Sequence, residues 1–182
     1  MRAGWACIGL VAMGCAPGDH RYFPLAVGNK WSYSVKEDFS SRVEDLEVVR
    51  RVPVGRWSGF ELKGNSGSSR LAWDGSTLWA AELASQSFDP PLPLFSRGPI
   101  SWQGTTLVQG KRRKAEAQLQ VMTDKYRYAG REQDTVLTTL SLTENGRTVQ
   151  LETWFSEHVG ILKQEQRTND RRDRRIEYLS GP

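Results

Sequence analysis

Apolar and polar residues alternate along most of the chain, which is the pattern of strands with one buried face. Trp31, Tyr33 and Val35 alternate with polar neighbours, and Ala115–Val121 has the same period. Successive side chains of a strand point to opposite faces of its sheet, so each run gathers its apolar residues on one side. The same pattern predicts further strands in these segments: Leu46–Val54, Phe60–Leu62, Leu71–Trp73, Thr77–Ala81, Val136–Leu142, Val149–Phe155, Ile161–Gln166 and Arg175–Leu179.

Two pairs of these strands are joined by sequences typical of tight hairpin turns. Asp74-Gly75 and Asn145-Gly146 supply residues that tolerate the positive φ of such turns. A sheet of about nine to eleven antiparallel strands must curl or split into two layers. We therefore expect an all-β fold with a single curled antiparallel sheet, as an open half-barrel or barrel-like structure, and with few or no helices.

Two segments carry helix signals as well. Ser41–Glu44 matches a capping box, and Lys111–Gln120 contains good helix formers. We favour strands in both, because the neighbouring segments alternate and an isolated helix would interrupt the run of hairpins.

The segment Phe88–Phe95 contains three closely spaced prolines. Proline cannot donate to a strand ladder, so we expect an extended, irregular loop here. Its apolar residues Leu92, Leu94 and Phe95 either plug one end of the sheet or form a lid or lip that faces a partner. Trp154 has the opposite parity to Phe155 and completes the candidate ligand or partner surface.

The chain opens with Arg2 and an apolar stretch from Ala3 to Met13, which is too short to span a bilayer and has the pattern of an export signal. Leu10–Cys15 resembles the lipobox of bacterial lipoproteins. The resemblance implies cleavage before Cys15, with diacylglycerol and an N-acyl chain on that residue and no other cofactor. The expected organisation is a signal peptide at 1–14, a lipidated tether at 15–21 and an antiparallel β domain at 22–182.

The cysteine content and the net charge limit the kinds of partner that we expect for this chain. Cys7 lies in the expected signal peptide, so Cys15 is the one cysteine left in the mature chain and no disulfide can form within it. Removing Arg2 changes the formal net charge from +4 to +3. This mild, interspersed charge argues against a nucleic-acid partner. The expected partners are a membrane, through the lipid anchor, and an envelope protein or lipid.

Catalytic and metal-binding patterns are weak. His158 follows Glu157 at an expected turn, yet no serine stands in a nucleophile-elbow sequence, and the ligand spacings of zinc sites are absent. We therefore predict no enzymatic activity, no catalytic residues and no metal ligands. The basic clusters Lys111–Lys114 and Arg171–Arg175 are either solvated strand ends that discourage edge pairing or contacts for lipid headgroups or peptidoglycan.

Two wider resemblances concern the whole domain. Tyr22–Leu25, Gly28-Asn29 and Trp31, together with Trp154-Phe155 and Val159–Lys163, resemble a group of uncharacterised envelope lipoproteins. The expected architecture is distantly similar to the lipoprotein carriers of the LolA and LolB type, which hold acyl chains in a half-barrel.

The sorting rule of Gram-negative lipoproteins, with Ala16 after the cysteine, implies the periplasmic side of the outer membrane. Two functions remain open: a non-enzymatic binding or structural module, and a carrier of lipids or lipoproteins.

Overall fold

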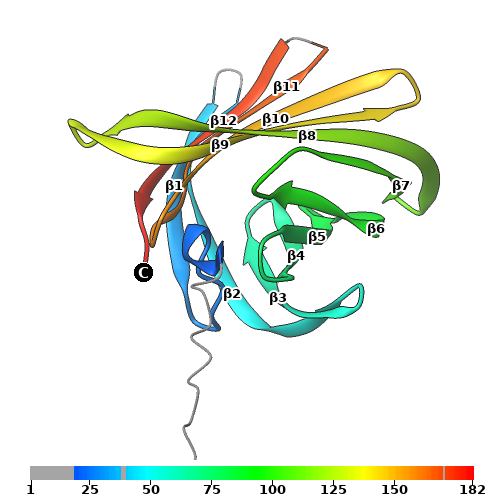
Figure 1. The fold of residues 1–182 in the computed structure, drawn as a ribbon, viewed down its shortest axis with the longest axis horizontal. Coiled ribbons are helices and arrows are strands. Elements are labelled where there is room, and N and C mark those ends of the chain that lie inside the picture. The colour runs from blue at the N-terminus through cyan, green and yellow to red at the C-terminus, as the bar shows by residue number, and fades with distance from the viewer. Residues whose placement is uncertain (1–18, 38–39, 170) are drawn as a thin grey trace, which may run out of the picture.

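The computed structural model describes residues 19–37, 40–169 and 171–182. These residues form one short 3-10 helix and twelve antiparallel strands that close into a barrel (Figure 1). The elements are η1 (Asp19–Tyr22), β1 (Lys30–Glu37), β2 (Ser40–Val54), β3 (Trp57–Gly64), β4 (Gly67–Trp73), β5 (Leu78–Leu83), β6 (Gln86–Phe95), β7 (Ile100–Val108), β8 (Lys111–Tyr128), β9 (Arg131–Glu144), β10 (Arg147–Ser156), β11 (Gly160–Thr168) and β12 (Arg171–Ser180).

The connectivity is the simplest that a barrel allows. Each strand pairs with the strands before and after it in the chain, and β1 pairs with β12 to close the sheet. The predicted all-β, curled antiparallel sheet is confirmed, and both ambiguous segments are strands, within β2 and β8. Among the described residues there is no helix with the length and apolar character to cross a membrane.

The sequence prediction misses two strands, β6 and β7, and the proline-rich segment lies in the first of them. The prediction of an irregular loop at Phe88–Phe95 is wrong, because this segment is part of β6 and pairs with β5 at Leu92, Pro93 and Phe95. On its other side β6 pairs with β7 only at Ser87, Phe88 and Asp89. The prolines that follow therefore lie beyond that ladder, where no backbone donor is required of them.

Where the ladder between β6 and β7 ends, the side chain of Trp102 of β7 donates hydrogen bonds to the backbone of β6. Its indole Nε1 donates to the carbonyl oxygens of Pro90, at 3.2 Å, and Pro91, at 3.0 Å. Gly104 allows this close approach, because a Cβ at that position would collide with the Trp102 ring and the Asp89 carbonyl. A side chain thus replaces the missing backbone hydrogen bonds in this part of the wall.

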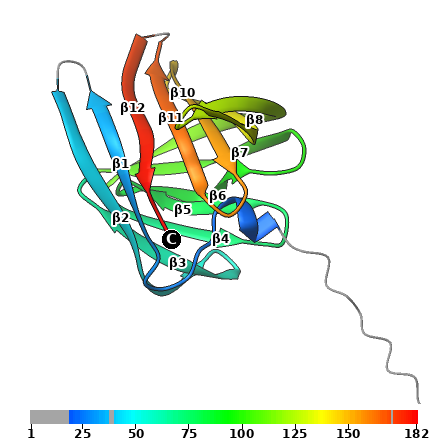
Figure 2. The same cartoon turned by 90° about the vertical axis from the view of Figure 1, so that its left-hand side faces the viewer.

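Because the strands run alternately up and down, the barrel has two distinct ends. We call the end that holds the β1–β2, β3–β4, β5–β6, β7–β8, β9–β10 and β11–β12 connections the mouth. We call the other end, which holds η1 and the chain's C-terminus, the base. Figure 2 shows the tip of the β11–β12 hairpin at one end and η1 with the C-terminus towards the other.

Aromatic side chains seal the base. Phe23 stacks on Trp31 with ring centroids 4.7 Å apart, and Phe95 meets the edges of Trp73 and Phe155 at 5.4 and 5.2 Å. All five side chains are buried. Their packing closes the lumen on the side where the described chain begins.

Helix η1 is held by hydrogen bonds at this aromatic base. The carboxylate of Asp19 is buried and accepts two hydrogen bonds from Arg97, at 2.7 and 2.9 Å. The backbone N–H of His158 donates to the carbonyl of Arg21, at 2.6 Å. Asp19, His20 and Arg21, which were expected in the tether, are thus part of the folded domain, because η1 ties three base turns together.

Candidate ligand-binding site

The barrel lumen contains a cavity of about 270 Å³. Its walls are shared by two buried clusters of apolar side chains, one around the aromatic base and one between β6, β7, β8 and β9. Leu83 and Leu94 pack against both clusters and also line the cavity. The sheet therefore encloses more space than its own side chains fill.

Most of the lining is aliphatic or aromatic. It comes from inward-facing positions on every strand except β7 and β8, among them Val35, Leu46, Leu62, Leu71, Leu92, Leu140, Leu142, Leu151, Phe155 and Ile176. The alternation in the sequence explains this, since every second residue of each strand points into the lumen. The result is an apolar chamber whose base end has no charged group among the described residues that line it.

The four residues expected to form one surface separate in the structure. Leu92 and Leu94 line the cavity. Phe95 is 2% exposed and belongs to the aromatic base. Trp154 lies on the outer face of β10, where Lys163 stands over its ring at 4.2 Å and Asp124 accepts a 2.8 Å hydrogen bond from its Nε1. Trp154 therefore does not share a surface with the other three.

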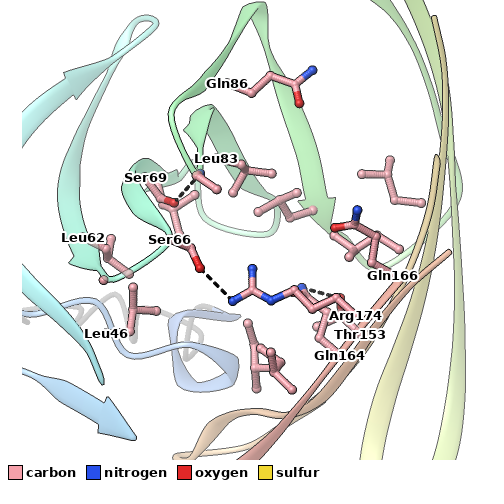
Figure 3. Close-up of a pocket in the computed structure, with 18 of the residues that line it drawn as sticks. Leu46, Leu62, Ser66, Ser69, Leu83, Gln86, Thr153, Gln164, Gln166 and Arg174 are labelled. Atoms are coloured by element: carbon pink, nitrogen blue, oxygen red, sulfur yellow. Dashed lines mark hydrogen bonds between the residues drawn. The ribbon is translucent and has the colours of Figure 1, made fainter. Parts of the chain in front are cut away.

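Polar residues gather where the cavity approaches the mouth. Arg174 extends from the inner face of β12 and donates to Glu44 of β2, at 2.8 Å. It also donates to Ser66, beside the tip of β3 and β4, at 2.9 Å (Figure 3). Ser66 in turn donates to Glu44 through its N–H and its hydroxyl, both at 3.0 Å. This Arg174–Glu44–Ser66 cluster spans from β12 past β1 and β2, along one side of the mouth.

Other polar groups line the cavity on β6 and β11. Gln86, Gln164 and Gln166 line the cavity, and the Gln164 amide donates to the hydroxyl of Thr153 at 3.0 Å (Figure 3). Next to Arg174, Arg42 forms a hydrogen bond that holds the pKa of Glu37 below its usual value. The chamber thus changes from apolar to polar along its axis.

One polar atom in the apolar part has no partner. Tyr33 lines the cavity and is 3% exposed, and its hydroxyl forms no hydrogen bond in the described structure. Burial raises the pKa of this phenol far above its usual value, so the group stays neutral. A buried hydroxyl without a partner is costly, and a polar atom of a bound molecule or a water would satisfy it.

Both basic clusters of the sequence lie at the mouth. Lys111–Lys114 begin β8 and Arg171–Arg175 begin β12, and Arg147 begins β10. Even-numbered strands of an up-and-down barrel all start at the same end. The clusters therefore lie on one rim, four strands apart in the sheet, although 60 residues separate Lys111 from Arg171 in the chain.

His158 has a structural contact at the base. Its backbone has a φ of 63° and its N–H supports η1. Across the described ranges, no cluster of three or more histidine, cysteine or acidic residues is arranged to hold a metal ion. The polar side of the cavity offers hydrogen-bond donors, acceptors and one guanidinium, which suits binding.

Sequence reasoning missed the polar side of the cavity and the shared rim. Glu44, Gln164, Gln166 and Arg174 occupy inward positions on their strands, and the alternation of those segments could have indicated this. To predict that both basic clusters lie on one rim, one must also count the strands between them. From β8 to β12 the chain crosses four strand-to-strand connections, an even number, so both strands start at one end.

No protein-family model matches the sequence, and no curated protein is similar to it. Solved structures do match the fold. A candidate lipoprotein from Parabacteroides distasonis aligns with a TM-score of 0.54 and 11% identity over 88% of this chain and 98% of that one. A candidate exported protein with a YmcC-like fold from Bacteroides fragilis aligns with a TM-score of 0.50 and 10% identity, with the same coverage of both chains. The hypothetical lipoprotein YmcC from Escherichia coli aligns with a TM-score of 0.43 and 8% identity, over 86% of each chain. The chain is thus similar in fold to exported bacterial proteins along nearly its whole described length.

Proposed function

We propose that this chain is a lipid-anchored lipoprotein of the bacterial envelope, without enzymatic activity, whose barrel binds an apolar ligand in its lumen. The single observation that carries the ligand is the cavity of about 270 Å³ between two packed clusters. The lipobox at Leu10–Cys15, which falls outside the described residues, and the similarity in fold to candidate lipoproteins support the anchor.

The cavity is large enough to matter energetically. Pockets for small ligands usually occupy about 300–1,000 Å³, so this one lies just below that range. Each methylene that leaves water contributes about 0.8 kcal/mol, so roughly eight of them contribute about 6 kcal/mol before the cost of association. Without that cost, 6 kcal/mol would correspond to a dissociation constant of about 40 micromolar, so tighter binding needs contacts beyond the buried methylenes.

The position of the anchor orients the barrel. Asp19 is fixed at the base by Arg97, and only residues 16–18 stand between it and Cys15. Cys15 and Asp19 are four residues apart, which is at most about 14 Å of extended chain, so a lipid on Cys15 would hold the base close to the membrane. The mouth would then face away from that membrane, where it could meet a ligand or a partner protein.

The test is binding of an uncharged fluorescent probe, N-phenyl-1-naphthylamine, to the Cys15→Ser protein, which keeps every described residue and lacks the attachment site. We expect enhanced, saturable fluorescence. Leu151 lines the cavity, and Leu151→Trp should fill it and weaken binding at least about tenfold, because the larger side chain excludes the probe.

The matched control is Leu107→Trp, at an exposed leucine of β7. It should bind the probe as the parent does, and thermal unfolding should show that both variants fold. Binding that survives Leu151→Trp, or no binding by the parent, would contradict the proposal. Mass analysis of the mature N-terminus, with an acylated Cys15 expected, tests the anchor separately.

A carrier function is the second candidate, and the cavity favours it. A flat exposed aromatic patch over a filled core would have favoured a protein partner instead. A carrier releases its ligand, so the anchored protein should accelerate transfer of a fluorescent fatty acid between two vesicle populations. A binding module without carriage would retain the ligand and leave the transfer rate unchanged.

A further inference from the structure

We infer that the ligand is a single-chain amphiphile with an anionic head, held with its chain in the lumen and its head at the mouth. This inference rests on the proposed function and names the chemical class of ligand for the same cavity. Three features of the described residues carry it: the size of the chamber, the direction of its polarity and the charge of its rim.

The size of the chamber selects one chain. At about 30 Å³ for each water in the liquid, a cavity of about 270 Å³ holds the equivalent of roughly nine waters. That space suits one alkyl chain of moderate length and excludes the paired chains of a diacyl lipid. The aromatic base, where Phe23, Trp31 and Phe155 are buried, prevents a second chain from passing through the other end.

The polarity of the chamber selects an amphiphile. Apolar side chains surround its inner part, whereas Gln86, Gln166 and Arg174 line it towards the mouth. A ligand that is apolar throughout would leave these groups buried against hydrocarbon, at a cost. A molecule with a polar head pairs with them while its chain fills the space below.

The charge of the rim selects an anion. Glu144 accepts from Arg113 at 2.9 Å, and Glu44 accepts from Arg174 at 2.8 Å, so these inward carboxylates are already neutralised. In the described part of the chain, Lys111, Arg112 and Lys114 have no carboxylate within ion-pair distance. Of the other acidic residues at this end, Glu37 and Glu82 form ion pairs with Arg42 and Arg70, and Asp173 adds one negative charge. The rim therefore keeps a surplus of positive charge that attracts anions into the mouth.

Arg147 is the cation best placed to meet the head. It has the same parity as Val149 and Leu151, which line the cavity, so it stands on the inner face of β10 at the rim. Its guanidinium has one long contact, a 3.5 Å hydrogen bond to the hydroxyl of Thr168, and it is exposed. Its donors are available to a carboxylate or a phosphate.

The experiment compares decanoic acid with its methyl ester as competitors that displace N-phenyl-1-naphthylamine. The two molecules share a short chain that suits the cavity and differ in the charge of the head. The Cys15→Ser protein should bind the acid at least about fivefold more tightly, and added salt should reduce this preference. Arg147→Gln should weaken binding of the acid about fivefold and leave the ester unchanged. Arg131→Gln, an equally exposed arginine at the base, is the matched control and should change neither.

The outcomes separate this inference from the function on which it rests. Equal affinity for acid and ester, or no selective effect of Arg147→Gln, overturns the anionic head and leaves the apolar site standing. Loss of the ester as well as the acid in Leu151→Trp supports the lumen as the site. Acid binding that persists in Leu151→Trp places the anion on the outer rim and overturns the inference. If neither molecule binds the parent, the proposed function and the inference both fail.

Dodecyl phosphate used as a competitor distinguishes a phosphate head from a carboxylate head by its relative potency.

Discussion

Tyr33 illustrates how a single residue reflects an unfilled site. Its aromatic ring belongs to the buried cluster at the base, as the alternation of Trp31, Tyr33 and Val35 predicts. The sequence cannot indicate that its hydroxyl lacks a hydrogen-bond partner, because that depends on which side chains arrive from β12 and β2. The ring stabilises the barrel, whereas the hydroxyl is a cost in the empty protein.

Replacement of this tyrosine by phenylalanine should therefore stabilise the empty barrel. Tyr33→Phe removes a buried hydroxyl that has no partner, and we expect the free energy of unfolding in urea to rise by up to about 1 kcal/mol. Tyr126→Phe is the comparison, because the Tyr126 hydroxyl donates to Glu177 at 3.2 Å and its loss should cost about 1 kcal/mol. A destabilised Tyr33→Phe protein would mean that the hydroxyl is satisfied in the empty barrel.

At the scale of elements, the sequence predicts ten of the strands and misses β6 and β7. Turn residues such as Asn145-Gly146 and a clean alternation are local signals, so they predict strands without information about which strands pair. Strand β6 is different, because its prolines are compatible with a strand only where pairing with β7 has stopped. That condition is set by Trp102, which lies beyond the next turn and bonds the proline carbonyls from there.

Strands β11 and β12 are also joined by charge. Glu165 of β11 is 3% exposed and lies within ion-pair distance of Lys163, Arg167, Arg172 and Arg175. Burial alone would raise the pKa of Glu165, but the hydrogen bond from Lys163 and the surrounding cations hold it below its ordinary value of 4.5. On β3, a hydrogen bond from Arg50 lowers the pKa of Glu61 in the same way.

These shifts predict the acid stability of the barrel. A carboxyl whose pKa is lower in the folded state stabilises the fold above its unfolded pKa, and this contribution is lost as the pH falls through the folded value. The urea midpoint should thus decline below about pH 4.5. Glu165→Gln should cost about 2 kcal/mol at neutral pH and flatten that decline.

The comparison for this pH dependence is Glu132→Gln, at an exposed position near the start of β9. It should leave both the neutral-pH stability and the acid decline close to those of the parent. An acid decline in Glu165→Gln as steep as in the parent would show that Glu165 does not link the proton to folding.

On the scale of the whole molecule, the barrel is closed by aromatic rings at its base and lined by polar groups towards its mouth, with an apolar chamber between them. The class of fold follows from the sequence pattern, and so does the gathering of basic residues on one rim once strands are counted. The chamber itself does not follow, because its volume is the small difference between the space enclosed by twelve strands and the side chains that fill it.

The most direct measurement is native mass spectrometry of the Cys15→Ser protein, exported by bacteria and purified without detergent. We predict a population that carries one single-chain lipid, lost on denaturation and absent from Leu151→Trp. A spectrum with the protein mass alone, together with no lipid in an organic extract, would contradict a lipid-filled lumen. The same lipid retained by Leu151→Trp would contradict it equally.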